Sequence, residues 1–185
     1  APDAVTAAIH AATARVTAYR ILDADAPALD TPGTHALAGT AVEVVSPVTA
    51  WADLMERLFD FDAIRALIAG GFRLRFDAMC AVTGPYAVEV LERRLGALPG
   101  TVVNATPLPD FGGMHPDPNP TWARDLWDAL MDPAGLDFGA ASDGDGDRNM
   151  ILGRGCYVSP SDSLAVLAAN AHLCPGDAGG LAGIA

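Results

Sequence analysis

Three aspartates alternate with two glycines in the stretch DGDGDR, which spans residues 143–148. In an extended segment residues i, i+2 and i+4 project to the same side, so Asp143, Asp145 and Asp147 converge if the backbone curls slightly. The intervening glycines permit such a curl because a residue without Cβ tolerates positive φ. Converging carboxylates repel one another unless a cation lies between them, and a donor set of hard oxygens suits Mg²⁺ or Mn²⁺. The stretch therefore predicts a divalent-metal loop.

Two other interpretations of this stretch compete with a metal loop of that kind. Aspartate and glycine are also the residues of an ordinary solvated turn, and Asp-x-Asp-x-Asp opens EF-hand calcium loops. The EF-hand fails on spacing, because the sixth position requires glycine and is Arg148, and the twelfth requires glutamate and is Arg154. Apolar runs at 138–141 and 150–152 flank the stretch. A polar, glycine-containing loop between two strand-like runs favours a site over an ordinary turn.

The sequence on both sides of the loop predicts the elements that position it. Alternating residues at 72–77 indicate a strand, a helix begins at Gly84-Pro85 and continues through Leu95, and a short strand follows at 101–104. The other expected elements are a helix at 121–131, strands at 138–141, 150–152 and 157–158, a hairpin turn at Arg154, and a final helix from Ser159-Pro160 through Leu173. This order predicts an α/β fold, specifically a three-layer α/β/α domain with a mixed sheet.

The residues before this domain predict a helical and loop arm. Apolar positions at helical spacing indicate a helix over 3–19, and a mixture of Ala, Asp, Pro and Gly indicates a linker over 23–39. The β-branched run at 40–45 indicates a strand. Ser46-Pro47 then begins a helix, and a second helix ends at Gly70-Gly71.

Composition and charge limit the classes of partner. A chain of 185 residues has room for one domain with a flanking arm, and 51% hydrophobic residues can fill a core. The formal net charge of −12 opposes contact with nucleic acid and anionic membranes, so we expect neither as a partner. An anionic sugar phosphate is repelled too, which makes a local cation and Arg148 necessary for phosphate chemistry.

Three cysteines, Cys80, Cys156 and Cys174, are odd in number and lack CxxC spacing. We interpret them as reduced, mostly buried thiols of a cytoplasmic protein. We also expect no signal peptide and no membrane-spanning segment, because we find no apolar run of the length that a membrane requires.

Several stretches together resemble one enzyme family. Residues 137–153 resemble the metal-binding loop of the α-D-phosphohexomutases, and within that family the loop of the phosphoglucomutases. Four more stretches resemble phosphoglucomutase segments in the family's order and at roughly its spacing: FDFD at 59–62, FDAM at 76–79 with GPY at 84–86, DFGG at 110–113 with HPDPN at 115–119, and SPSDS at 159–163. The resemblance covers nearly the whole chain.

The resemblance implies a place for this chain within a four-domain enzyme. Residues 1–39 correspond to the end of the first domain and a linker, 40–175 to the second domain with the metal loop, and 176–185 to the start of the connection to the third domain. The family's catalytic phosphoserine lies on a first-domain loop that is absent here, so no residue of this chain is expected to be a catalytic nucleophile. Ser142 adjoins the metal loop, but no base is positioned beside it in sequence.

The resemblance also implies a reaction. Phosphoglucomutases interconvert glucose 1-phosphate and glucose 6-phosphate through a phosphoserine and glucose 1,6-bisphosphate. By this analogy Asp143, Asp145 and Asp147 hold one Mg²⁺, and Asp147 and Arg148 face the substrate. Arg148 either presents its planar fork to phosphate oxygens or forms a salt bridge back to an aspartate, and both can hold together. The expected partners are a sugar phosphate and the remaining mutase domains, and the isolated chain should be inactive.

Alternatives and departures from the family pattern remain open at this point. A phosphomannomutase or a phosphoglucosamine mutase shares the DGDGDR loop, and a non-catalytic metal-binding module is a further alternative. Cys80 and Met114 stand where the family often has histidine, which puts any role of those imidazoles in doubt. His115 and Asp117 suggest a second ligand pair, but they lack a partner at defined spacing, and a rigid loop held by prolines is the simpler interpretation.

Overall fold

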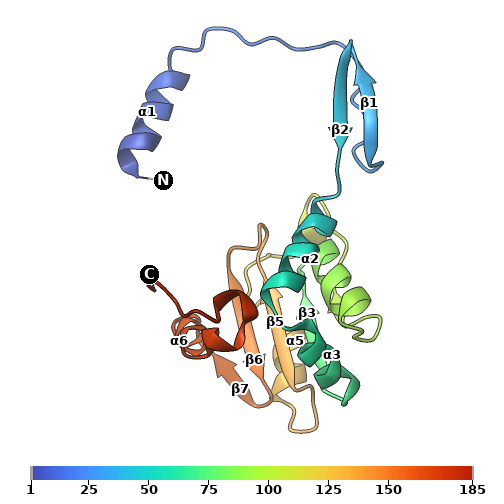
Figure 1. The fold of residues 1–185 in the computed structure, drawn as a ribbon, viewed down its shortest axis with the longest axis vertical. Helices are drawn as coiled ribbons and strands as arrows, with labels where there is room; N and C mark the ends of the chain where they lie inside the picture. Colours follow the sequence, from blue (N-terminus) through green and yellow to red (C-terminus); the bar gives the residue numbers. More distant parts are fainter. Residues whose placement is uncertain (1, 185) are drawn as a thin grey trace. The chain divides into compact units, whose positions relative to one another are not determined.

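The structure, a computed structural model, describes residues 2–184 and divides between Ser46 and Pro47 into two compact units. The first unit holds helix α1 (Asp3–Thr13) and the antiparallel strands β1 (Gly33–Leu37) and β2 (Thr40–Val44). The second unit holds all the remaining elements, and its strands lie side by side with helices on both sides (Figure 1).

Two expectations for the first unit are wrong. The linker expected over 23–39 contains strand β1, which pairs with β2 through a two-residue turn. Ala38 and Gly39 both have positive φ in that turn, at 47° and 84°, as a type I′ hairpin requires. Alanine rarely occupies the first position of such a turn, so the sequence did not predict the hairpin. The helix expected over 3–19 ends at Thr13, since none of its residues is buried and only local hydrogen bonds support it.

The second unit begins with two helices, α2 (Pro47–Leu58) and α3 (Phe61–Ala69), which confirms the two helices expected there. Asp60 caps α3, because its side chain accepts a hydrogen bond from the Ala63 amide. The last helix, α6 (Pro160–Asn170), has Ser159 as its N-cap, which accepts a hydrogen bond from the Asp162 amide. The starts of α2 and α6 were predicted from Ser46-Pro47 and Ser159-Pro160, whereas the cap at Asp60 was not identified from the sequence.

A five-stranded mixed sheet forms the centre of the second unit, in the order β4-β3-β5-β6-β7. Strand β3 (Leu74–Asp77) lies parallel to β4 (Val102–Val103) on one side and to β5 (Phe138–Ser142) on the other. Strands β6 (Asn149–Gly153) and β7 (Cys156–Val158) continue the sheet in antiparallel fashion. The expected mixed sheet is confirmed.

Helices cover both faces of this sheet. Leu126 and Leu130 of α5 (Arg124–Met131) pack against Ala141, Met150 and Leu152 on one face. On the other face, helix α4 (Gly84–Ala87) and the following π-helical segment η1 (Val88–Arg94) pack against β3 and β4; the apolar side chains that meet there are Phe76, Ala87, Val88, Leu91 and Val102. The arrangement confirms the three-layer α/β/α fold.

The segment between β4 and α5 is irregular, as its proline and glycine content predicted. Its exception is a short 3₁₀ turn at Phe111–Gly113. The helix expected to begin at residue 121 begins at Arg124. The preceding residues form a turn instead, because the side-chain oxygen Oδ1 of Asn119 accepts hydrogen bonds from the Thr121 and Trp122 amides. This Asn119 turn holds the irregular segment against the start of α5.

Candidate metal centre

The DGDGDR loop joins the antiparallel strands β5 and β6. Ser142 pairs with Asn149 at its base, and the Asp143 amide donates a hydrogen bond to the Arg148 carbonyl at 3.2 Å. Strands β3, β4 and β5 are parallel, so the loop leaves the carboxyl edge of the sheet, where ligands bind in open α/β folds.

Asp143 organises the loop from inside. The residue is only 1% exposed, and its Oδ1 accepts hydrogen bonds from the Gly146 and Arg148 amides, each at 3.0 Å. Its Oδ2 accepts one from Arg148 Nε, also at 3.0 Å. Burial raises the pKa of Asp143, but the hydrogen bonds from Arg148 outweigh burial and hold that pKa below its ordinary value. The carboxylate is therefore ionised at neutral pH.

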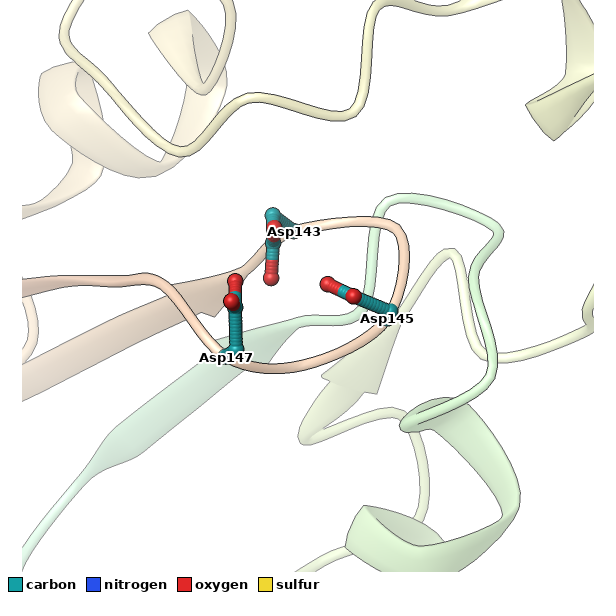
Figure 2. Close-up of side chains that lie close together, drawn as sticks. All are labelled: Asp143, Asp145 and Asp147. Atoms are coloured by element: carbon teal, nitrogen blue, oxygen red, sulfur yellow. The ribbon is translucent and has the colours of Figure 1, made fainter. Parts of the chain in front are cut away.

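Asp145 and Asp147 are exposed, and their side chains point toward Asp143 around a common space (Figure 2). One carboxylate oxygen from each of the three residues lies within 4.8 Å of the others. Opposite ligands of an octahedral Mg²⁺ stand about 4.2 Å apart, so a small inward shift of the exposed side chains brings all three within bonding distance. The three residues fit a hard divalent cation.

The charges in this cluster are not balanced within the loop. The pKa of Asp147 is raised, first by the negative charge of Asp145 and then by Asp143. Arg148 offsets part of this repulsion, since its Nε lies 3.8 Å from Asp147 Oδ1. The carboxylates still repel one another although Arg148 contacts two of them. This residual repulsion favours a bound cation, the ion that the sequence predicts here.

Gly146 lets the loop close against its neighbours. Its φ is +84°, and a Cβ at this position would lie 2.7 Å from Thr83 Cγ2. Gly144 lies against the ring of Phe111, where an added Cβ would be 3.3 Å from Cζ. The loop is therefore packed on both sides, unlike an ordinary solvated turn.

Arg148 links the aspartate loop to the irregular segment before α5. Its Nη1 donates to Asp117 Oδ1 at 2.7 Å, while Asn119 Nδ2 donates to the other Asp117 oxygen at 2.8 Å. The hydrogen bond with Asp143 is the main cause of the raised pKa of Arg148. The salt bridge back to an aspartate, one of the two roles expected for Arg148, is present in the structure. Its side chain is still 63% exposed and can turn toward a ligand.

Asp117 was named in the sequence only as half of a pair with His115. The structure separates the two roles, since the His115 ring lies 4.8 Å from the Trp122 ring while Asp117 binds Arg148. The partner of Asp117 lies 31 positions away, so spacing gave no signal for it.

Met114 packs against the α5 core, and Cys80 is half-buried in the loop after β3.

Two hydroxyls lie behind the loop. Ser142 is 6% exposed, and its Oγ lies 2.6 Å from Thr83 Oγ1. Ser142 is thus held by another hydroxyl and buried, which favours a positioning role over a nucleophilic one. Thr83, which also contacts Gly146, was not identified from the sequence because no motif marks it.

The loops that follow β3 and β4 carry backbone strain at the same edge of the sheet. Met79, Cys80 and Asn104 have positive φ, at 52°, 53° and 50°. The buried Asp77 accepts hydrogen bonds from the Met79 amide at 2.9 Å and from Asn104 Nδ2 at 2.8 Å, and so fixes these turns. Strained backbone concentrated at the carboxyl edge is typical of a functional site.

A cavity of about 610 Å³ borders the metal loop. Ser142, Asp145 and Arg148 line its polar end, and Phe76, Tyr86 and Ile151 are among the residues of its apolar part. Trp51 closes over Tyr86 in an edge-to-face contact with ring centroids 5.4 Å apart. Of the three aspartates, Asp145 lines this space, which is large enough for a small ligand.

Among the residues that the structure describes, no helix is long and apolar enough to cross a membrane. Cys80, Cys156 and Cys174 are all free thiols, as the sequence predicted, but the expectation that most are buried is wrong, since Cys80 and Cys174 are half-buried and Cys156 is exposed.

Comparison with known proteins gives consistent matches. Residues 50–155 match the family model of the phosphoglucomutase/phosphomannomutase α/β/α domain II. The phosphoglucomutase of Rhizobium radiobacter is 59% identical over 185 residues, which are 100% of this chain and 34% of that protein. The chloroplastic phosphoglucomutase of Arabidopsis thaliana is 46% identical over 93% of this chain and 28% of its own length.

The fold also matches a solved structure. The open form of the phosphoprotein pp63/parafusin of Paramecium, a phosphoglucomutase by its title, superposes with a TM-score of 0.84 and 42% identity, over 94% of this chain and 34% of that one. This chain thus spans about a third of the length of the proteins that it matches.

Proposed function

The chain belongs to the phosphoglucomutase/phosphomannomutase family, and from this premise we propose that it is the metal-bearing part of a phosphoglucomutase. The parent enzyme would interconvert glucose 1-phosphate and glucose 6-phosphate. The names of the relatives support this choice of sugar, at 59% and 46% identity. The observation that carries the role of this segment is the convergence of three carboxylate oxygens within 4.8 Å, next to a cavity that Asp145 lines.

Asp143, Asp145 and Asp147 would hold the metal, with Mg²⁺ the expected ion. A bound Mg²⁺ supplies positive charge beside a phosphoryl group during its transfer. Asp143 holds the loop through two backbone amides, and the two exposed aspartates can adjust to the ion. This division of labour suits a site that must be fixed at one side and adaptable at the other.

Arg148 would bind phosphate oxygens of the substrate, and Asp147 would lie beside them. In the structure Arg148 is anchored at Nε by Asp143 and at Nη1 by Asp117, so its guanidinium plane is oriented before a ligand arrives. A guanidinium held in this way offers a planar pair of donors to a phosphate. Asp117 acts as a positioning residue in this proposal.

The reaction proposed for the parent enzyme passes through glucose 1,6-bisphosphate. A phosphoserine outside this segment would give its phosphoryl group to a free hydroxyl of the sugar monophosphate, which releases its proton. The bisphosphate then turns over, and its other phosphoryl group returns to the serine. This segment would contribute charge neutralisation and position, and the isolated chain is expected to be inactive.

We propose that residues 1–39 belong to the end of the family's first domain with a linker, 40–175 to the second domain and 176–185 to the start of the connection to the third. The family match at 50–155 lies inside the proposed second domain. A cytoplasmic location is proposed for the parent enzyme, with the three free thiols in support.

The alternative functions make different predictions. A phosphomannomutase or phosphoglucosamine mutase would prefer another sugar, and a non-catalytic metal-binding module would retain metal affinity without activity in the complete protein. The test is a coupled assay of the complete parent enzyme with Mg²⁺ and a trace of glucose 1,6-bisphosphate, on glucose 1-phosphate and on mannose 1-phosphate. We expect faster turnover of the glucose substrate, and a loss of about 100-fold or more in Asp145→Ala.

Equal or better turnover of mannose 1-phosphate would favour the mannose enzyme. No turnover of any hexose phosphate, with Mg²⁺ binding intact, would favour the non-catalytic module. Unchanged activity in Asp145→Ala would reject the metal role of the loop.

A further inference from the structure

A second cavity, of about 730 Å³, lies at the amino edge of the sheet, away from the aspartate loop. Its walls come from the end of α3, from the chain that enters β3, from the turn between η1 and β4, and from the residue two places before β5. The lining is largely apolar and includes Ile68, Phe72, Leu95, Leu98 and Leu136. Its volume is that of a site for a small organic molecule.

Four arginines line this second cavity, and three of them have partners. Arg65 pairs with Glu56 and Asp62, each at 2.7 Å. Arg94 pairs with Asp53 at 2.7 Å and with Glu89 at 3.0 Å. Arg73 donates to the Gly135 carbonyl at 2.5 Å and lies 3.9 Å from Asp137.

Arg75, the fourth arginine, differs from the other three. It is half-buried, and within residues 2–184 its side chain makes no hydrogen bond or ion pair. Because every fully buried polar side-chain atom among these residues has a partner, the guanidinium nitrogens of Arg75 must still be reachable from solvent. The Arg75 guanidinium is therefore a cation that no group among these residues neutralises and that an anion from solvent can reach.

The cavity thus combines an apolar wall with a single uncompensated cation. This combination recognises a particular kind of molecule, one with an anionic head and an apolar body. The net charge of −12 repels anions from the protein in general, so an anion that binds here must be held by local contacts.

We propose that this cavity is a binding site for a small organic anion, with a carboxylate or phosphate head on Arg75 and an apolar body against Leu98 and Leu136. The site lies at the opposite edge of the sheet from the metal loop, so it is separate from the proposed reaction. It would give the domain a second ligand, whose binding stabilises the fold by mass action.

The test uses two matched naphthalene probes on the full 185-residue chain, followed by NMR of backbone amides and of the Arg75 Nε–H. The anionic probe is 2-naphthoate and the neutral probe is 2-naphthylmethanol. We expect 2-naphthoate to bind saturably with a Kd of about 1 mM or tighter, to shift signals of Ile68, Leu98 and Leu136, and to bind about tenfold more tightly than the alcohol.

Two variants separate the charge from the fold. Arg75→Gln should weaken naphthoate binding about tenfold and leave the alcohol unchanged. Leu98→Glu, at a side chain that is 79% exposed, should weaken naphthoate by repulsion without disturbing the core. Arg124→Gln is the matched control, since Arg124 pairs with Asp128 on the exposed side of α5.

Equal binding of the two probes, shifts that lie outside this cavity, or an equal loss of affinity in Arg124→Gln would each overturn the proposal. Saturable binding that Arg75→Gln or Leu98→Glu leaves unchanged would overturn it as well.

Discussion

Aspartates gather at the carboxyl edge of the five-stranded sheet and arginines at its amino edge, and the two groups differ in how far their charges are paired. At the carboxyl edge, oxygens of three aspartates lie within 4.8 Å of one another, and Arg148 contacts two of these residues, Asp143 and Asp147. At the amino edge, Arg65, Arg73 and Arg94 are matched by carboxylates or carbonyls, and among the described residues of that cavity Arg75 is the arginine left unmatched. Matched charges stabilise a fold modestly and need nothing more, whereas unmatched charges lower stability until a ligand arrives. Unpaired charges therefore indicate which residues bind a ligand.

The comparison also separates two kinds of aspartate within the metal loop. Asp143 is buried and satisfied, so it is as much a structural residue as a ligand. Asp145 and Asp147 are exposed and repel each other, so the fold does not require their charges, whereas a bound cation would use them.

The largest effect is expected when the buried aspartate is removed. Asp143→Ala leaves the Gly146 and Arg148 amides without their acceptor and Arg148 Nε without its counter-charge. We expect a loss of about 3 kcal/mol in the free energy of unfolding. Urea denaturation measures it, with Asp145→Ala as the matched variant, which should change stability by less than about 0.5 kcal/mol in the absence of metal. Equal losses in the two variants would remove the distinction between the aspartates.

A smaller effect is expected at the glycine that closes the loop. Gly146→Ala forces a side chain into positive φ and brings its Cβ to 2.7 Å from Thr83 Cγ2. The expected loss is about 2 kcal/mol, and Thr83→Ser should recover part of it by removing the clashing methyl group. Gly144→Ala is the control, since its Cβ meets only the edge of the Phe111 ring at 3.3 Å. A larger loss at Gly144 than at Gly146 would contradict this account of the loop.

The smallest effect is expected at the amino edge, where Asp137 is matched. The hydrogen bond from the Arg73 amide, together with the charges of Arg154 and Arg73, holds the pKa of Asp137 below its ordinary value. A carboxyl whose folded pKa is lowered stabilises the fold above its unfolded pKa, near 3.9, and this contribution disappears as the pH falls through the folded pKa. Asp137→Asn should therefore lose less stability than the parent chain between pH 5 and pH 3. Urea denaturation at a series of pH values measures this loss. The same decrease in the free energy of unfolding between pH 5 and pH 3 in both proteins would show that the Asp137 contacts contribute nothing.

Much of the second unit was predictable because local rules govern it. Ser-Pro pairs marked the starts of α2 and α6, alternation marked β3, and alternating aspartates with glycines marked the metal loop. The fold class followed from the order of these elements. For the site, the three aspartates and Arg148 were identified because all lie within one six-residue stretch.

What could not be predicted depends on contacts between distant residues. The pairs of Arg148 with Asp117 and of Ser142 with Thr83 span 31 and 59 positions, and no local pattern records them. Strand β1 forms because β2 pairs with it, through a turn that begins with an alanine. The lack of a partner for Arg75 likewise depends on the positions of the carboxylates in the folded chain, and no single stretch of sequence gives those positions.

The most direct test of the metal site is a Mg²⁺ titration of the chain by calorimetry and thermal unfolding. Asp145→Ala is compared with Asp125→Ala, an exposed aspartate in the first turn of α5. We expect Mg²⁺ to bind and raise the Tm of the chain and of Asp125→Ala, and to do neither in Asp145→Ala, which should be no less stable than the parent without metal. The same Mg²⁺ affinity in Asp145→Ala and the parent chain would contradict the assignment of these three aspartates as the metal site.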